Sequence, residues 1–237
     1  MKRISPLSRR WLPAPCHLCT RDAVEPHGLC PACWREWQAL LGRRRCPGCG
    51  AVHDHETDGR LRCGRCLRHP RGFDAAVAAV DLEPPVRHLV HRLKYHHDFS
   101  VLTLLRGTLT QAVLADVDAG GPVPEAIVPM PQHPAQHGRR GFNQARLLAE
   151  GPGRALDRPV LPGAARRLRD TGSLTALSAT ERKRVLRDAF EAGGPLPERV
   201  AIVDDVLTTG ASSEALTRAL RQAGVAHVSV WALARTP

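Results

Sequence analysis

Residues 200–212 read VAIVDDVLTTGAS, and this stretch decides the fold of the larger part of the chain. It opens with an apolar run over 200–203, continues with two adjacent carboxylates, Asp204 and Asp205, and ends in a small loop rich in hydroxyl groups. The following residues, 214–221, have the composition of a helix. The pattern predicts a strand, an acidic tip, a loop of phosphate size and the start of a helix.

The loop is suited to bind a phosphate. Backbone N–H groups in the first turn of a helix are unpaired, and the helix dipole favours an anion there. Threonine and serine hydroxyls add donors, and a glycine lets the backbone come close to the ligand. Ionised carboxylates only accept hydrogen bonds, which suits the vicinal hydroxyls of a ribose. The predicted phosphate-binding residues are Thr208, Thr209, Gly210, Ala211 and Ser212.

This layout resembles the phosphoribosyl diphosphate (PRPP) motif of type I phosphoribosyltransferases. The alternative is an ordinary strand-to-helix connection with solvated aspartates, and the order of all the residues over 200–212 favours the PRPP motif over it. A Walker A loop is excluded, because the chain has no GxxxxGK[ST] sequence.

All eight cysteines precede residue 67 and form four C-x-x-C pairs. Two thiolates at this spacing can face one tetrahedral ion, and two such pairs complete its coordination. We expect two structural Zn²⁺ sites, paired in sequence order, although the spacing also allows a crossed pairing. The predicted ligands are Cys16, Cys19, Cys30, Cys33, Cys46, Cys49, Cys63 and Cys66.

The alternatives for these cysteines are four disulfides or redox pairs. Disulfides would require export, and no apolar segment follows Arg9-Arg10 as it would in a twin-arginine signal. Four copies of C-x-x-C suit metal better than redox chemistry. No run of about 18 apolar residues is present, so no membrane insertion is expected. We therefore predict a cytoplasmic protein.

The chain is basic, with 34 Lys and Arg against 23 Asp and Glu and a formal net charge of +11. Such a balance favours anionic partners, namely PRPP, diphosphate or nucleic acid. An arginine-rich set flanks the second cysteine group and is either a phosphate-contacting patch or a solvated face. Its members are Arg43, Arg44, Arg45, Arg60, Arg62, Arg65 and Arg68.

The remainder of the chain alternates strand and helix patterns, which predicts a parallel α/β sheet. We expect two domains, a zinc module over 1–70 and an α/β domain over 71–237. In such sheets ligands bind beyond the carboxyl ends of the strands, so the loops 130–140 and 204–212 should meet there. Strands are expected over 74–80, 126–128, 200–203 and 225–234, and helices over 84–97, 102–117, 142–150 and 214–221, with a further helix opened by a capping box at 178–181.

Three further segments extend the resemblance. They are HRLKYHHD over 91–98, VPMPQHPAQHGRRGFNQA over 128–145 and VDDVLTTGAS over 203–212. Together with the double cysteine motif, they resemble the ComF family over nearly the whole chain. ComF proteins are similar to type I phosphoribosyltransferases, carry an N-terminal double zinc ribbon and are linked to natural competence. The resemblance implies a type I phosphoribosyltransferase-like parallel sheet flanked by helices, with PRPP, single-stranded DNA and other competence proteins as partners.

The resemblance also implies roles for individual residues. Asp204 and Asp205 would be the catalytic pair that holds the ribose 2′- and 3′-hydroxyls, and Mg²⁺ would accompany PRPP. Asn143 and Gln144 would either face the site or lock a helix, and Lys94 and Tyr95 would either belong to the site or pack. The implied diphosphate loop consists of Met130, Pro131, Gln132, His133, Arg139 and Arg140.

The segment 166–187 resembles the mobile hood of these folds but departs from the family pattern. Leu174 stands where glutamine is usual, and Val185 stands where asparagine is usual. Two polar groups are therefore missing near the acceptor side, which bears on the reaction more than on PRPP binding. Three functions stay open: a phosphoribosyltransferase with an unknown acceptor, a non-catalytic PRPP sensor, and an adaptor that binds single-stranded DNA.

Overall fold

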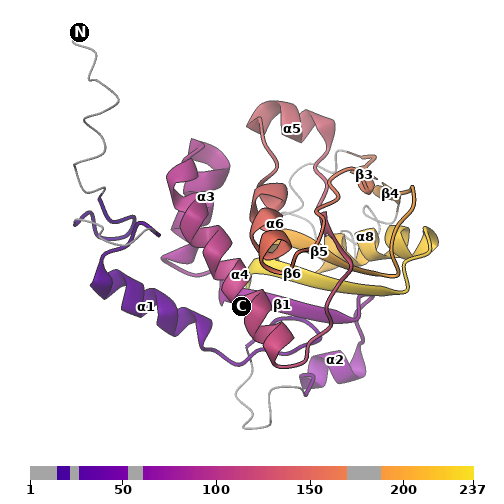
Figure 1. Cartoon of the computed structure of the whole chain (residues 1–237), viewed down its shortest axis with the longest axis horizontal. Coiled ribbons are helices and arrows are strands. Elements are labelled where there is room, and N and C mark those ends of the chain that lie inside the picture. The colour runs from indigo at the N-terminus through magenta and orange to yellow at the C-terminus, as the bar shows by residue number, and fades with distance from the viewer. Residues whose placement is uncertain (1–14, 22–26, 53–60, 170–187) are drawn as a thin grey trace.

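The computed structural model of the chain describes residues 15–21, 27–52, 61–169 and 188–237 (Figure 1). Its central element is a four-stranded sheet in the order β1-β6-β5-β2, in which all neighbouring strands are parallel. The predicted α/β class is confirmed. The strands of this sheet are β1 (Ala75–Asp81), β2 (Ala126–Pro129), β5 (Arg199–Leu207) and β6 (His227–Arg235), and a separate antiparallel pair consists of β3 (Ala165–Arg167) and β4 (Phe190–Ala192).

The central strands are buried on both faces. All of β2 and nearly all of β6 are buried, as is the first half of β5 after Arg199. A parallel sheet covered by helices on both sides needs apolar side chains at consecutive positions rather than alternating ones. The uninterrupted apolar run 200–203 meets this requirement and places β5 in the middle of the molecule.

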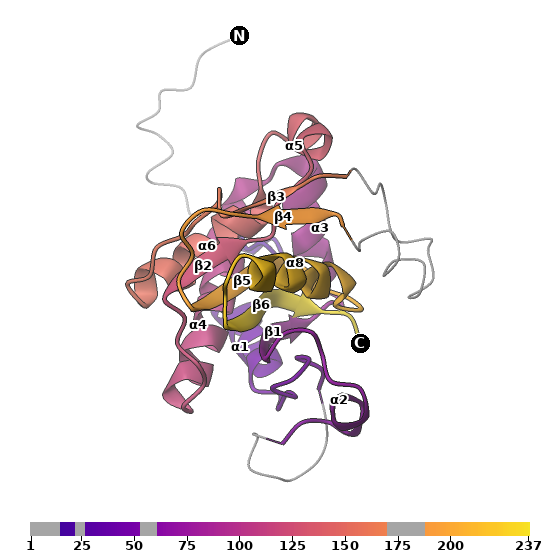
Figure 2. The same ribbon diagram turned by 90° about the vertical axis from the view of Figure 1, so that its right-hand side faces the viewer.

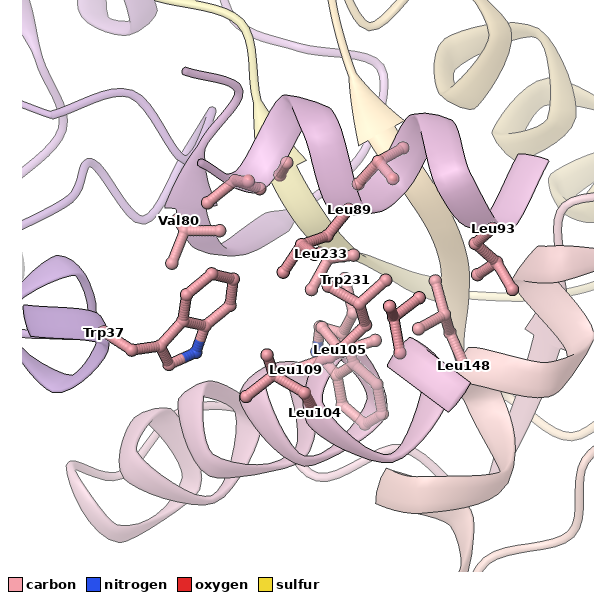
Figure 3. Packing of buried hydrophobic residues seen from close by; sticks show 14 of the residues in the cluster. Trp37, Val80, Leu89, Leu93, Leu104, Leu105, Leu109, Leu148, Trp231 and Leu233 are labelled. Carbon is pink, nitrogen blue, oxygen red and sulfur yellow. The ribbon is translucent and has the colours of Figure 1, made fainter. Parts of the chain in front are cut away.

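One face of the sheet is covered by four helices, which are α1 (Pro31–Leu41), α3 (Val86–His96), α4 (Leu102–Asp118) and α6 (Gln144–Ala155). A short 3₁₀ turn, η2 (Phe99–Val101), joins α3 to α4. Figure 3 shows Leu89 and Leu93 of α3 facing Leu105 and Leu109 of α4, with Trp231 of β6 beside them. This cluster is the larger of the two cores that flank the sheet.

The other face is covered by α8 (Ala211–Gln222) and the β3–β4 pair. Side chains alternate along β5, so that Ala201 and Val203 join the first core while Val200 and Ile202 join the second. β5 therefore connects both cores. The alternation does not hold to the end of the strand, because Val206 packs against the first core and Leu207 lies in the second.

Three secondary-structure predictions were wrong. The loop predicted over 132–141 contains a helix, α5 (Pro134–Arg140). Proline is its first residue, and the side chain of His133 caps it by accepting a hydrogen bond from the Ala135 N–H. The strand predicted to end at residue 203 continues to Leu207, so the acidic pair lies within β5. The helix predicted to stop before 151 continues to Ala155.

Close packing explains the glycines inside α6. A Cβ atom at Gly151 would lie 2.6 Å from Cγ of Arg106 on α4, and one at Gly153 would lie 2.8 Å from Cγ2 of Val160. The glycines thus let neighbouring segments approach α6, and the favourable contacts outweigh their low helix propensity. The capping-box helix predicted at 178–181 lies outside the described residues.

Both zinc-ribbon modules pack against the sheet domain. In the first, the indole Nε1 of Trp37 on α1 donates to Oγ1 of Thr108 on α4 at 2.8 Å in the buried core. In the second, which carries α2 (Gly64–Arg68), the carbonyl of Pro47 accepts from the backbone N–H of Ala76 on β1 at 2.7 Å. Figure 2 shows α2 beyond the β1 edge of the sheet. The domain boundary at residue 70 stays a prediction.

Candidate phosphate pocket and zinc centres

The hydroxyl-rich loop lies at the carboxyl end of β5, where a pocket of about 490 Å³ opens. The pocket is lined by Asp204, by the loop, by the first turn of α8 and by the end of the chain after β6. All five predicted phosphate-binding residues line it. The complete lining is Arg65, Asp204, Val206, Leu207, Thr208, Thr209, Gly210, Ala211, Ser212, Ser213, Arg235, Thr236 and Pro237.

Gly210 makes the turn from the loop into α8. Its φ of +84° lies in the left-handed region that favours glycine, and α8 begins at the next residue. Arg71 braces the loop, because one guanidinium nitrogen, Nη1, donates to the Thr209 carbonyl at 2.8 Å and lies 3.4 Å from the Glu214 carboxylate. The first turn of α8 therefore lines the pocket with its backbone N–H groups, of which that of Ala211 donates to Thr209 Oγ1 at 3.4 Å.

The two carboxylates of the acidic pair lie in different surroundings. Asp204 lines the pocket, whereas Asp205 is buried and its Oδ2 lies 2.6 Å from the Lys94 ammonium on α3. This follows from the strand alternation, because successive side chains of β5 point to opposite faces. Lys94, which the sequence left undecided between packing and the site, is thus a partner of the acidic pair.

The surroundings move the pKa values of the two carboxyls in opposite directions. Burial, together with the negative charge of Asp205, raises the pKa of Asp204 to about 8. Burial alone would also raise the pKa of Asp205, but attraction to Lys94 and hydrogen bonds from Lys94 and Gln144 outweigh burial and lower it. In the free protein Asp205 is the ionised member of the pair.

The predicted diphosphate loop follows β2 and reaches the same edge of the sheet. The Met130 N–H donates to the Val203 carbonyl at 2.8 Å, so this loop begins directly beside Asp204. Met130 and Pro131 are buried, His133 caps α5, and Arg139 lies within that helix. The loop after β2 thus starts beside the acidic pair, but none of its described residues lines the pocket at the end of β5, so its role as the diphosphate loop stays a prediction.

A polar network joins this loop to the acidic pair. Gln144 Oε1 accepts from Gln132 Nε2 at 2.6 Å and from Arg140 Nη1 at 3.0 Å, and Gln144 also contributes to the lowered pKa of Asp205. Asn143 has the other role, because its Oδ1 caps α6 at the Arg146 N–H while its Nδ2 donates to the Met130 carbonyl. Gln144 therefore faces the site, and Asn143 fixes the start of the helix.

Sequence reasoning did not find two basic residues of the pocket, Arg65 and Arg235. Arg235 follows an apolar strand at the edge where ligands bind, and this position was a usable signal. Arg65 was noted only as a member of the arginine-rich set. Nothing in its local sequence links it to a loop that lies so far along the chain.

The cysteines form two separate groups in sequence order, Cys16, Cys19, Cys30 and Cys33, and then Cys46, Cys49, Cys63 and Cys66. Within each group the sulfurs lie within 4.8 Å of one another, and the Cys49–Cys63 sulfur distance is 3.8 Å. A tetrahedral ion with Zn–S bonds of about 2.3 Å separates its ligands by about 3.8 Å. The sets fit structural Zn²⁺, paired sequentially.

Backbone donors support the second zinc centre. The N–H groups of Gly48 and Cys63 donate to Sγ of Cys46 at 3.4 and 3.1 Å. A hydrogen bond from the Cys49 thiol and these N–H groups lower the pKa of Cys46, against the effect of burial. A low thiol pKa favours the thiolate that binds metal.

Within the described part of the chain, no helix has the length and apolar character needed to cross a membrane.

Comparisons with known proteins agree with both parts of the chain. A family model described as a double zinc ribbon domain matches residues 7–67. The DNA utilization protein YhgH of Escherichia coli K12 is 36% identical over 95% of this chain and 98% of its own. Competence protein F of Haemophilus influenzae is 33% identical over 90% and 92%, and Competence protein ComFC of Streptococcus pneumoniae is 24% identical over 87% of both. With the two cysteine groups and the parallel sheet in place, the chain belongs to the ComF family of competence and DNA utilization proteins.

Proposed function

We propose that this protein binds PRPP together with Mg²⁺ in the pocket at the end of β5 and transfers the phosphoribosyl group to an acceptor. One observation carries the proposal: Asp204 and the first turn of α8 line the same cavity. The cavity thus offers acceptors for ribose hydroxyls beside donors for a 5′-phosphate. The relatives are named for DNA utilization and competence, which supports a nucleic-acid component or its precursor as the acceptor class.

The carboxyl of Asp204, which lines the pocket, would suit Mg²⁺ once ionised, because the ion takes oxygen ligands and is commonly bound by one or two carboxylates along with substrate phosphates. When bound, the ion would neutralise charge on the diphosphate of PRPP. The protein's own part is to bind the 5′-phosphate on the loop 208–212 and to hold the ribose hydroxyls at Asp204. The loop after β2 and Arg140 would receive the diphosphate.

In the proposed transfer, a nitrogen of the acceptor attacks C1 of the ribose while the bond from C1 to the diphosphate oxygen breaks. The electron pair of that bond leaves with diphosphate, and the proton released from the acceptor nitrogen passes to water. No described side chain is needed as a fixed base, since positioning and charge stabilisation supply most of the rate. A cytoplasmic location suits this proposal, because reduced thiols are required for the two zinc centres.

A second function, binding of single-stranded DNA, is favoured by an aromatic group beside the acidic pair. Tyr95, next to Lys94, is 62% exposed, and Phe99 is 49% exposed. The Arg140 guanidinium carbon lies 5.6 Å from the centre of the Tyr95 ring. Exposed aromatic rings next to cations are suited to stack nucleobases. On this proposal the strand would pass the mouth of the site.

Diphosphate release tests transfer against PRPP sensing. Zinc-loaded protein is incubated with PRPP, Mg²⁺ and a panel of purine and pyrimidine bases and nucleosides. Release that depends on an acceptor and is abolished in Asp204→Asn/Asp205→Asn supports a transferase. An exposed carboxylate at the far end of α4 provides the control, Asp118→Asn, which should release diphosphate as the wild type does. Release equal in wild type and in the double variant would contradict the proposed site.

A further inference from the structure

The pocket at the end of β5 is not built by the α/β domain alone. Arg65, from helix α2 of the second zinc ribbon, lines it together with the loop that precedes α8. The zinc module, which the sequence suggested to be a separate structural unit, therefore supplies a positive charge to the wall of the candidate phosphate site.

The second ribbon is fixed to the sheet by short contacts. Arg62 Nη2 donates to the Asp74 carbonyl at 2.7 Å, and Arg45 forms an ion pair with Asp81 at 2.9 Å. Gly50, with a φ of +70°, passes so close to β1 that a Cβ atom there would lie 2.8 Å from Cβ of Ala78. These contacts hold α2, and with it Arg65, at a fixed place relative to the pocket.

Arg235 connects the second zinc centre directly to the loop. Its Nε donates to the carbonyl of Cys49, a predicted zinc ligand, at 3.1 Å. Its Nη1 donates to the Leu207 carbonyl at 3.1 Å and also contacts the Thr208 carbonyl. Because these carbonyl oxygens accept hydrogen bonds from the guanidinium, its positive charge offsets their partial negative charge. They therefore repel an anion in the pocket less strongly.

The arginines around the pocket differ in how many hydrogen bonds and ion pairs their guanidinium groups form with the protein. Arg71 binds the Thr209 carbonyl and Glu214, and Arg235 binds backbone carbonyls. Arg65 makes no side-chain hydrogen bond or ion pair with any described residue while lining the same space. It is therefore the cation of the pocket wall that is available to a ligand.

We propose that the second zinc ribbon is part of the anion site, in which Arg65 binds the phosphate group held by the loop and Arg235 positions that loop from the zinc centre. The inference rests on the proposed function, in that the pocket must take a phosphate. It assigns the ribbon a role in ligand binding beyond that of a folded metal module. Arg65 would be a ligand-contacting residue, and Arg235 a positioning residue.

Arg65→Gln tests this proposal in the full-length, zinc-loaded protein. Isothermal titration with PRPP and Mg²⁺, and separately with inorganic phosphate, should give an affinity about tenfold lower for each ligand, since one charged hydrogen bond to the phosphate is lost. Arg65→Lys should recover part of the affinity. Arg68→Gln, on the same helix and also exposed but outside the pocket lining, is the matched control and should bind as the wild type does. Zinc content of two ions per chain in all variants shows that the ribbon is intact.

Arg235→Lys tests the positioning residue, because it keeps the charge but cannot reach both Cys49 and the loop. Phosphate affinity should fall while zinc content stays at two per chain. Unchanged phosphate and PRPP affinities in Arg65→Gln would overturn the inference and leave the proposed function standing. Phosphate binding that depends on Arg65, without PRPP binding, would support the inference and contradict the proposed function. No binding of either ligand by the wild type would overturn both.

Discussion

The ammonium group of Lys94 lies 2.6 Å from Oδ2 of Asp205, and this ion pair joins α3 to the strand that carries the acidic pair. The Asp205 side chain is 9% exposed and that of Lys94 is 19% exposed, so water screens the pair only weakly. Lys94 thus supplies the positive charge that compensates for two adjacent carboxyls near the carboxyl end of a buried strand.

Replacing Lys94 by glutamine should reduce the free energy of unfolding by about 2 kcal/mol, because a buried carboxylate loses its counter-ion. The lowered pKa of Asp205 means that its ionised form stabilises the fold above the unfolded-state pKa, so the full effect should appear at pH 7.5. Urea unfolding measures it. The double variant Lys94→Gln/Asp205→Asn should recover most of the loss. If the losses of Lys94→Gln and Asp205→Asn simply add up in the double variant, the pair does not interact.

Asp204→Asn should stabilise the protein increasingly as the pH rises from 6 to 8. The folded-state pKa of Asp204, about 8, lies above the unfolded value, so ionisation favours the unfolded chain throughout this window. The stability advantage of the variant should grow by roughly 1 kcal/mol per pH unit and level off above pH 8. Urea unfolding across this range measures it, with Asp118→Asn as the control. An advantage that does not change with pH would contradict the assigned pKa.

Gly210→Ala should lower both the stability of the fold and the affinity for the ligand, whereas the control Gly224→Ala should lower stability alone. Gly210 directly precedes α8 and has a φ of +84°. Gly224 follows the end of the helix with a φ of +98°, and no atom lies within 4 Å of the position of a Cβ added there. Alanine at either position costs about 1 kcal/mol of stability from backbone strain. Phosphate affinity, measured by calorimetry, should fall only in Gly210→Ala. Equal affinities in the two variants would argue against a phosphate at the loop.

The contact between Trp37 and Thr108 predicts how firmly the first ribbon is joined to the α/β domain. Thr108→Val leaves the buried indole N–H without its acceptor and should cost about 2 kcal/mol. In a Trp37→Phe background the same threonine change should cost much less, because the donor is already gone. Thermal unfolding of the four proteins forms a double-mutant cycle, and an interaction energy near zero would indicate that the ribbon is loosely attached.

Much of the fold could be predicted from sequence because its signals are local. The run 200–203 reads as a buried parallel strand, and the C-x-x-C pairs identify the zinc ligands. Their sequential rather than crossed grouping is shown by the structure. The full length of α6 could not be predicted, because Gly151 and Gly153 are explained by contacts with Arg106 and Val160 that the local sequence does not show.

For the candidate site too, features encoded by consecutive residues could be predicted, and features that depend on packing could not. The loop 208–212 was predictable because its residues are consecutive in the chain. Strand alternation places the side chains of Asp204 and Asp205 on opposite faces. This separation was not predicted, because the predicted strand ended at residue 203. The ion pair of Asp205 with Lys94 and the place of Arg65 in the pocket depend on how distant segments pack, and no local pattern shows such packing.

The central claim is that the pocket binds PRPP, and calorimetric titration tests it most directly. PRPP is titrated with and without Mg²⁺ into zinc-loaded wild type, Asp204→Asn/Asp205→Asn and the control Asp118→Asn. We predict Mg²⁺-dependent binding by the wild type and the control, and its loss in the double variant. Absence of binding to the folded, zinc-loaded wild type would contradict the claim and favour DNA binding as the primary function.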